Sequence, residues 1–177
     1  MWITNYNWVK TIDNNVKISY MNEGFQHLRY NYSLKKKRWK LEAFVQYQYN
    51  KVMNLKERDL LGGGLRFKIM PMNYVGSGFM YERNLTYTGI NVNYIKSNTY
   101  ISLCAFVSNN IKFSNTTYFQ FNLLNTKYRV YNILEATVNI YKRISYKMSF
   151  IVQYDNDHIY NSPMLTYNTV HKISITF

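Results

Sequence analysis

The sequence predicts an all-β fold, an antiparallel up-and-down transmembrane β-barrel of about ten strands, and three observations support it. Apolar and polar residues alternate, as in ISYKMSFIVQYD (144–155), where every even position is apolar and most odd positions are polar. The best apolar run, 101–107, is already broken by Ser102, so no segment reaches the roughly 18 apolar residues of a spanning helix. The chain ends on Phe177, with Ile173 and Ile175 on the same face, as expected of a closing strand that carries a C-terminal assembly signal.

The first five strands are separated by turn-forming clusters. The strand at 38–50 shows the pattern most clearly, because Leu41 and Val45 share one face while Lys40 and Glu42 share the other. The next strand repeats it, with apolar residues at 61, 65, 67 and 69 opposite basic residues and glycines. The expected ranges are about 1–10, 16–33, 38–50, 58–70 and 74–84.

The last five strands continue the same alternation. Val130, Leu134 and Val138 lie on one face of 127–141, and Arg129 and Glu135 lie on the other. The expected ranges are about 95–108, 111–122, 127–141, 144–155 and 165–177. An even number of strands places both termini on the same side of a barrel, and a missing N-terminal piece would raise the total from ten to about twelve.

The connections are expected to differ in length between the two ends of the barrel. With the N-terminus on the periplasmic side, the external loops would include Lys51–Glu57, Asn84–Tyr94 and Asn156–Met164. The internal turns would be shorter, as at Met70–Asn73 and Lys142–Arg143. Long external loops and short internal turns are typical of outer-membrane barrels.

Length and composition indicate a single domain over residues 1–177. The N-terminus has no signal-peptide pattern, so an exported barrel would have to be a processed or truncated chain. Cys104 is the single cysteine, which excludes an intramolecular disulfide. The net charge of +13 favours an anionic partner, such as lipid head groups or lipopolysaccharide. Nucleic acid is not expected, because aromatic residues and cations segregate to opposite strand faces instead of sharing one.

The predicted inward positions carry both signs of charge. In a narrow interior such side chains should pair, because an unpaired charge in a dry environment is costly. The pattern is therefore interpreted as a plug-like network, and the alternative is a narrow, water-filled path whose basic excess favours anions. The predicted lumen charge network consists of Glu23, His27, Arg29, Lys40, Glu42, Arg58, Arg66, Lys68, Glu82, Arg129, Glu135, Lys147 and Asp155.

No catalytic, metal or cofactor site is predicted. The histidines are scattered over an inward position (His27), an external loop (His158) and an outward position (His171), and no outward serine accompanies His171. Asp155, Asp157 and His158 lie close together, but they are interpreted as a turn and not as a metal site. The glycines at 62–64, 76 and 78 precede no helix, so they are expected to let the sheet bend or to make room for bulky inward neighbours.

Several segments carry a family resemblance, among them GFQHLRYNY (24–32), EAFVQYQYNK (42–51), RDLLGGGLRF (58–67) and GSGFMYE (76–82). From about residue 16 onward the chain resembles the salt-induced outer-membrane protein family, a DUF481-like β-barrel domain of unknown function. The resemblance implies a Gram-negative outer-membrane location, insertion by the barrel-assembly machinery and a role in envelope or osmotic stress. It carries over no catalytic residue.

The expected function is thus a structural or narrow-pore outer-membrane barrel without enzymatic activity. Two alternatives stay open. One is a lipid-modifying enzyme or small-solute transporter that uses the external loops. The other is a soluble β-barrel that binds an apolar ligand, which would have the apolar faces inside.

Overall fold

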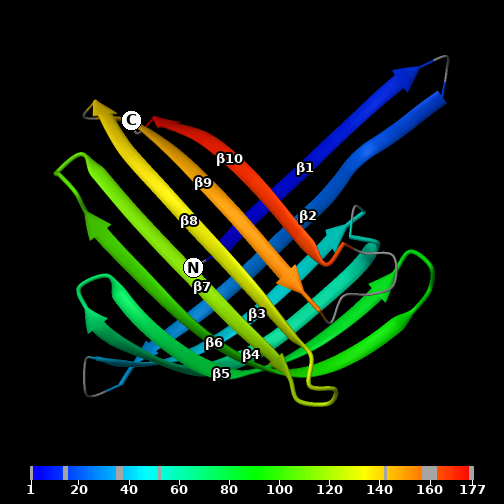
Figure 1. Ribbon diagram of the computed structural model, residues 1–177, viewed down its shortest axis with the longest axis horizontal. Coiled ribbons are helices and arrows are strands. Elements are labelled where there is room, and N and C mark those ends of the chain that lie inside the picture. The colour runs from blue at the N-terminus through cyan, green and yellow to red at the C-terminus, as the bar shows by residue number, and fades with distance from the viewer. Residues whose placement is uncertain are drawn as a thin grey trace.

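The protein is an all-β chain in the part that the computed structural model describes, residues 2–13, 16–34, 38–51, 53–141, 143–156 and 163–175. Figure 1 shows the strands as a continuous meander. No helix in these ranges could span a membrane. The strands are β1 (Trp2–Asp13), β2 (Val16–Ser33), β3 (Trp39–Asn50), β4 (Leu55–Met70), β5 (Asn73–Thr86), β6 (Asn91–Phe106), β7 (Ile111–Asn122), β8 (Tyr128–Tyr141), β9 (Ile144–Asp155) and β10 (Leu165–Ile175).

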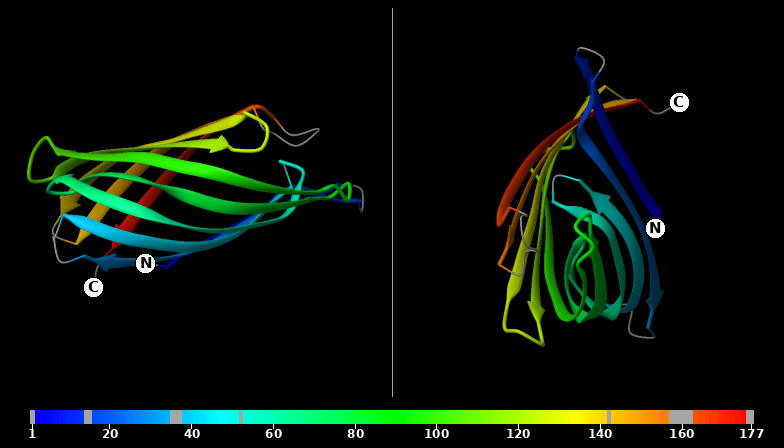
Figure 2. Two further views of the ribbon diagram at one scale, coloured as in Figure 1. Left: turned by 90° about the horizontal axis from the view of Figure 1, so that it is seen from below. Right: turned by 90° about the vertical axis from the view of Figure 1, so that its right-hand side faces the viewer.

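The strands form one sheet in chain order, and every neighbouring pair is antiparallel. The predicted all-β, up-and-down arrangement is therefore confirmed. The sheet curls into a half-barrel, in which β1–β3 and β7–β10 form two walls joined by β4–β6 (Figure 2). Among the described residues β1 and β10 do not pair, so both edges of the sheet are open.

The strands extend further into the connections than the sequence predicts. β4 begins at Leu55, and the turn between β5 and β6 is only 87–90. The expectation of systematically longer external loops is therefore wrong, since by the strand bounds only the 156–164 connection exceeds the internal turns. The reason is that main-chain pairing continues where polar residues occupy both faces and the alternation that marks a strand has ended.

Glycines crease the sheet between β4 and β5. A Cβ on Gly78 would lie 2.1 Å from the carbonyl oxygen of Gly63 and 2.6 Å from the Cα of Gly64. The two backbones approach so closely that no side chain fits between them. Gly76 instead leaves room for the ring of Tyr100, whose atoms would lie as close as 2.3 Å to a Cβ. Both predicted uses of the glycines, bending and space for bulky neighbours, thus occur in this sheet.

The convex face of the sheet is apolar, as the alternation predicts. Leu61 and Phe79, on neighbouring strands of this face, are 61% and 63% exposed. Its exposed apolar residues include Trp39, Leu41, Val45, Leu65, Ile95, Leu103, Phe119, Leu134, Met148 and Phe150. This arrangement is the reverse of a water-soluble domain, in which most large apolar side chains are buried.

A polar cluster lies on the convex face at the middle of β7 and β8. Asn132 donates hydrogen bonds to Thr117 Oγ1 (2.7 Å) and Asn115 Oδ1 (3.2 Å), and Asn115 donates to Asn132 Oδ1 (3.3 Å). Thr117 in turn donates to Asn115 (3.1 Å). These three side chains therefore satisfy much of their hydrogen-bonding capacity within the sheet. We call them the convex polar cluster.

Candidate functional site

The concave face of the half-barrel gathers most of the charged and amide side chains. The buried residues of the described chain are more often polar than apolar. The apolar ones are Leu55, Leu60, Met80, Tyr94 and Tyr100, whereas the polar ones are His27, Glu42, Asn50, Arg58, Glu82, Asn84, Thr86, Lys96, Asn98, Asn122, Arg129, Ser149 and Asp155.

Glu82 is the centre of the largest ion-pair cluster. Its carboxylate is fully buried and lies 3.1 Å from Arg129 and 3.3 Å from both Arg58 and Lys96. Arg129 also bonds Asp155 at 2.6 Å. All five side chains are more than nine-tenths buried. These three cations and two carboxylates, the Glu82 cluster, come from β4, β5, β6, β8 and β9 and tie the wall of β7–β10 to the strands β4–β6 that join the two walls.

Glu42 forms a second cluster nearer the other end of the strands. Arg66 donates to its carboxylate at 3.2 Å, and Arg29 lies 4.0 Å away. The hydroxyl of Tyr100 donates to the same carboxylate at 2.5 Å. Because Glu42 lies on β3 and Tyr100 on β6, this bond also crosses the crease of the sheet. The carboxylate is thus held by two cations and one hydroxyl in a buried position.

Glu135 forms a more exposed pair with Lys147. Their closest nitrogen and oxygen atoms are 2.6 Å apart, and the two side chains are 28% and 36% exposed. Ser149 and Ser114 donate to the same carboxylate. Glu23 accepts a hydrogen bond from Asn50 at 2.7 Å. The pair of Glu135 and Lys147 is therefore more exposed to solvent than the ion pairs around Glu82.

His27 lies on the concave face as predicted, between two aromatic rings. Its ring is 6.0 Å from that of Phe25 and 5.8 Å from that of Phe44, stacked on both. Its Nδ1 lies 3.2 Å from Gln46 Oε1, and Gln46 donates to Gln48. The histidine therefore begins a chain of amides that leads toward Arg58, which pairs with Gln48 across β3 and β4.

A cavity of about 340 Å³ occupies the concave face between the two walls. Three arginines line it, Arg29, Arg58 and Arg129, together with His27. Amides from β3, β6, β7 and β9 and aromatic rings from β2, β3, β7 and β8 complete the lining. No aspartate or glutamate lies among the lining residues. We call this space the concave cavity.

The other residues predicted for the site are less connected. Lys40 and Lys68 lie on the concave side, and no ion pair of theirs occurs among the described residues. Ile173 and Ile175 lie on the convex side, 71% and 58% exposed, whereas Phe177 falls outside the described residues. The role of Ile173, Ile175 and Phe177 as an assembly signal concerns insertion into the membrane and stays a prediction.

The predicted outward histidine, His171, is exposed on β10 and hydrogen-bonds the hydroxyl of Tyr146 at 2.5 Å. The rings of the two residues are also stacked, 6.0 Å apart. His158 and Asp157 lie outside the described residues, whereas Asp155 belongs to the Glu82 cluster. Within the described ranges, no group of three or more histidine, cysteine or acidic side chains is placed to hold a metal ion.

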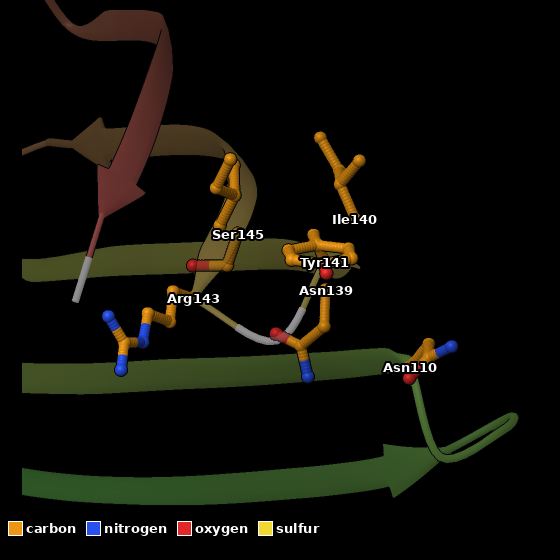
Figure 3. A pocket seen from close by; sticks show the side chains of 7 residues that line it. Asn110, Asn139, Ile140, Tyr141, Arg143 and Ser145 are labelled. Atoms are coloured by element: carbon orange, nitrogen blue, oxygen red, sulfur yellow. The ribbon is translucent and has the colours of Figure 1, made fainter. Parts of the chain in front are cut away.

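A second cavity, of about 390 Å³, lies at the ends of β7, β8 and β9. Figure 3 shows Asn139 and Tyr141 between Arg143 and Asn110, which lie at opposite ends of the cavity. Asn139 donates its backbone N–H to the carbonyl of Asn110 at 2.8 Å. Its lining comes from the adjoining ends of β8 and β9 and from the turn residues Asn110 and Arg143. Arg143 is the one charged residue in this lining, so the space lacks the converging charges of the concave cavity.

Sequence reasoning misses two important members of the site, Lys96 and Tyr100. Both lie on the polar side of β6, opposite Ile95 and Ile101. The alternation of Ile95, Ile101 and Leu103 is the signal that could have placed them inward. Their partners could not be found in this way, because Glu42 and Tyr100 meet only after the sheet has curled.

The comparisons with known proteins give a family and no closer relative. No curated protein and no solved structure matches the chain. One family model matches residues 5–161, which is most of the chain, and its description is "Protein of unknown function, DUF481". The chain therefore belongs to the DUF481 family of proteins of unknown function.

Proposed function

We propose that this chain forms the wall of a transmembrane β-barrel in a Gram-negative outer membrane, with a structural or narrow-pore role. The observation that carries the proposal is the reversed polarity of the sheet, whose convex face exposes apolar side chains while charges are buried inside. The strands have 11 to 18 residues, and a tilted strand needs about 9–11 to cross a bilayer.

Closure of the barrel is part of the proposal. Lipid cannot hydrogen-bond the open edges of β1 and β10, so a spanning sheet must cover them. Pairing of β1 with β10 would give ten strands, and an additional N-terminal hairpin would give about twelve. Either number of strands would close the barrel, and the concave residues described above would be the same in both.

Aromatic and basic residues support contact with lipid at both ends of the sheet. Tyr47, Tyr81 and Tyr87 are exposed toward one end, and Tyr32 and Trp39 toward the other. Amphipathic rings at two levels are typical of the aromatic girdles of outer-membrane barrels. Arg143 lies at the rim beside the second cavity and is placed to meet anionic lipid or lipopolysaccharide.

The interior favours a narrow or closed path. The Glu82 and Glu42 clusters both lie across the concave face, and among the described residues each contains one more cation than carboxylate. Any solute that passes must move along a lining of arginines and amides, which favours anions. A role in envelope or osmotic stress, which the family resemblance implies, is compatible with such a barrel.

The soluble alternative requires the opposite arrangement. A soluble barrel that binds an apolar ligand needs an apolar concave face and a polar convex face. Here the buried concave positions include Glu42, Arg58, Glu82 and Lys96. Tyr146 and His171 contact each other on the convex face, and among the described residues no serine or acid hydrogen-bonds either of them, so nothing there favours the enzymatic alternative.

A pair of arginine substitutions tests the membrane proposal. Phe79 is 63% exposed at the middle of β5, and Tyr87 is 47% exposed in the turn beyond that strand. In a membrane barrel, Phe79→Arg should lower the free energy of unfolding in lipid by about 2–4 kcal/mol. Tyr87→Arg, outside the spanning strands, should change it by less than about 1 kcal/mol.

The measurement is a urea titration of the chain refolded into lipid vesicles, with heat-modifiable gel migration as the sign of a folded barrel. Equal, near-zero effects of both substitutions would refute the membrane proposal, as would a monomeric, folded chain in water without detergent. Single-channel recordings at low and high salt then separate the two roles: discrete anion-selective steps indicate a pore, and silence of an inserted barrel indicates a closed one.

A further inference from the structure

The concave cavity contains a cation whose hydrogen-bonding groups are only partly used. Arg58 donates from Nε to Asn84 Oδ1 at 2.9 Å, and its closest approach to Glu82 is also through Nε, at 3.3 Å. Among the described residues, its two terminal nitrogens make no hydrogen bond, although Arg58 lines the cavity. Arg129, in contrast, bonds Glu82, Asp155 and Gln120 through all three nitrogens.

Two amides supply further donors to the same space. Gln48 lies directly opposite Arg58 on the neighbouring strand, and its Oε1 accepts from Gln46, which leaves its Nε2 group for another partner. Gln153 reaches the cavity from β9, on the other wall, and its Nε2 is buried without a hydrogen-bond partner within the described chain. A buried donor without an acceptor is unfavourable, so a ligand that supplies the acceptor would be stabilised there.

The charges along the cavity point to the sign of that ligand. Arg29, Arg58, Arg129 and His27 line the cavity, and no aspartate or glutamate is among its lining residues. An anion in the cavity would therefore meet guanidinium and amide donors without facing a like charge.

The rest of the lining is apolar and aromatic. Phe44 and Tyr118 face the cavity from opposite walls, and Leu60 and Met80 lie between them. These side chains offer apolar surface to the part of a ligand that carries no charge. A volume of about 340 Å³ is within the usual range for a small-molecule site.

We propose that the concave cavity binds a small organic anion, whose carboxylate or phosphate is held by the terminal nitrogens of Arg58 and the amide of Gln48. The uncharged ring of the ligand lies against Phe44 and Tyr118. This assignment rests on the proposed barrel, because it makes the cavity a solute site within the lumen. It adds the chemical class of the solute and the residues that select it.

The test measures binding by calorimetry with the full chain refolded in detergent, at low chloride. The probes are benzoate, phenyl phosphate, neutral benzamide and inorganic phosphate. Benzoate and phenyl phosphate should compete for one site, and each should bind at least tenfold more tightly than benzamide. Phenyl phosphate should bind at least fivefold more tightly than inorganic phosphate. Equal affinity for benzoate and benzamide, or for the two phosphates, would overturn the assignment.

A matched pair of variants separates the site from the general positive field. Arg58→Met should weaken benzoate binding at least tenfold. Arg66→Met removes the same charge from a concave arginine that does not line the cavity, so it should weaken binding less than threefold. Equal losses in the two variants would refute a specific role for Arg58.

Two further measurements keep the test decisive. If Arg58→Met does not fold, Arg58→Lys and Gln48→Leu replace it, and unchanged benzoate affinity in both would refute the site. Insertion into lipid vesicles is scored on the same samples. Loss of insertion then marks a failure of the barrel proposal, whereas an inserted wild-type chain that binds no benzoate marks a failure of the anion site.

Discussion

Neutralising Glu82 is the sharpest test of the interior ion pairs. The wild-type Glu82 cluster has three cations and two carboxylates, a net charge of +1, and Glu82→Gln raises it to +2 without changing the side-chain size. Glu82 is completely buried, so water cannot compensate for the lost charge. Breaking a buried pair by removing one partner costs about 3–5 kcal/mol, and we expect Glu82→Gln to lower the free energy of unfolding by that amount.

Glu135→Gln is the matched control for this substitution. It makes the same chemical change on the same concave face, but Glu135 and its partner Lys147 are 28% and 36% exposed. Solvent screening reduces the value of such a pair, so the expected loss is about 0–1 kcal/mol. The double variant Glu82→Gln/Lys96→Met returns the cluster to +1, with two cations and one carboxylate, and should recover part of the loss.

The assay is equilibrium unfolding in urea of the chain refolded in detergent micelles, followed by tryptophan fluorescence and by heat-modifiable migration. The reasoning would be refuted if Glu82→Gln and Glu135→Gln lowered stability equally. It would also be refuted if removal of Lys96 deepened the loss, since the destabilisation would then not come from excess positive charge.

Three more predictions concern the crease, the convex polar cluster and the Glu42 cluster. Gly78→Ala places a Cβ against backbone and should cost about 3 kcal/mol, whereas Gly24→Ala meets only the ring of Tyr49 and should cost about 1 kcal/mol; urea titration compares them. Asn132→Leu removes two donated bonds and should cost about 1 kcal/mol in lipid vesicles, and a stabilising effect would contradict this. Tyr100→Phe removes the hydroxyl that donates to Glu42 and should cost about 1.5–3 kcal/mol by the same titration; no change would contradict the bond.

The strands and their faces can be predicted from the sequence because a period of two residues is a local signal. Trp39, Leu41 and Val45 are exposed on the convex side, as the alternation requires. The ends of strands are missed where that signal fades, as at Leu55 and Thr86, which are both buried. There the main chain stays paired although the side chains no longer alternate.

The site can be predicted only in part. Alternation predicts which face of the sheet each charged side chain occupies, but its partners depend on how the sheet curls. Glu42 meets Tyr100, 58 residues later, and Glu82 meets Arg129, 47 residues later. Such contacts depend on curvature, which no short segment encodes by itself. The concave cavity is equally non-local, since its donors come from strands on both walls.

The crease at Gly64 and Gly78 sets the cross-section of the protein. An evenly curved sheet would enclose a round opening, whereas this one turns sharply at β4–β5 and brings its walls face to face (Figure 2). Across the crease the strands lie close enough for single side chains to meet, as the bond between Glu42 on β3 and Tyr100 on β6 shows. In the proposed barrel, strands added at the edges of the sheet would leave this spacing unchanged. The width of the interior beside the crease would then be set by two glycines, independently of the total number of strands.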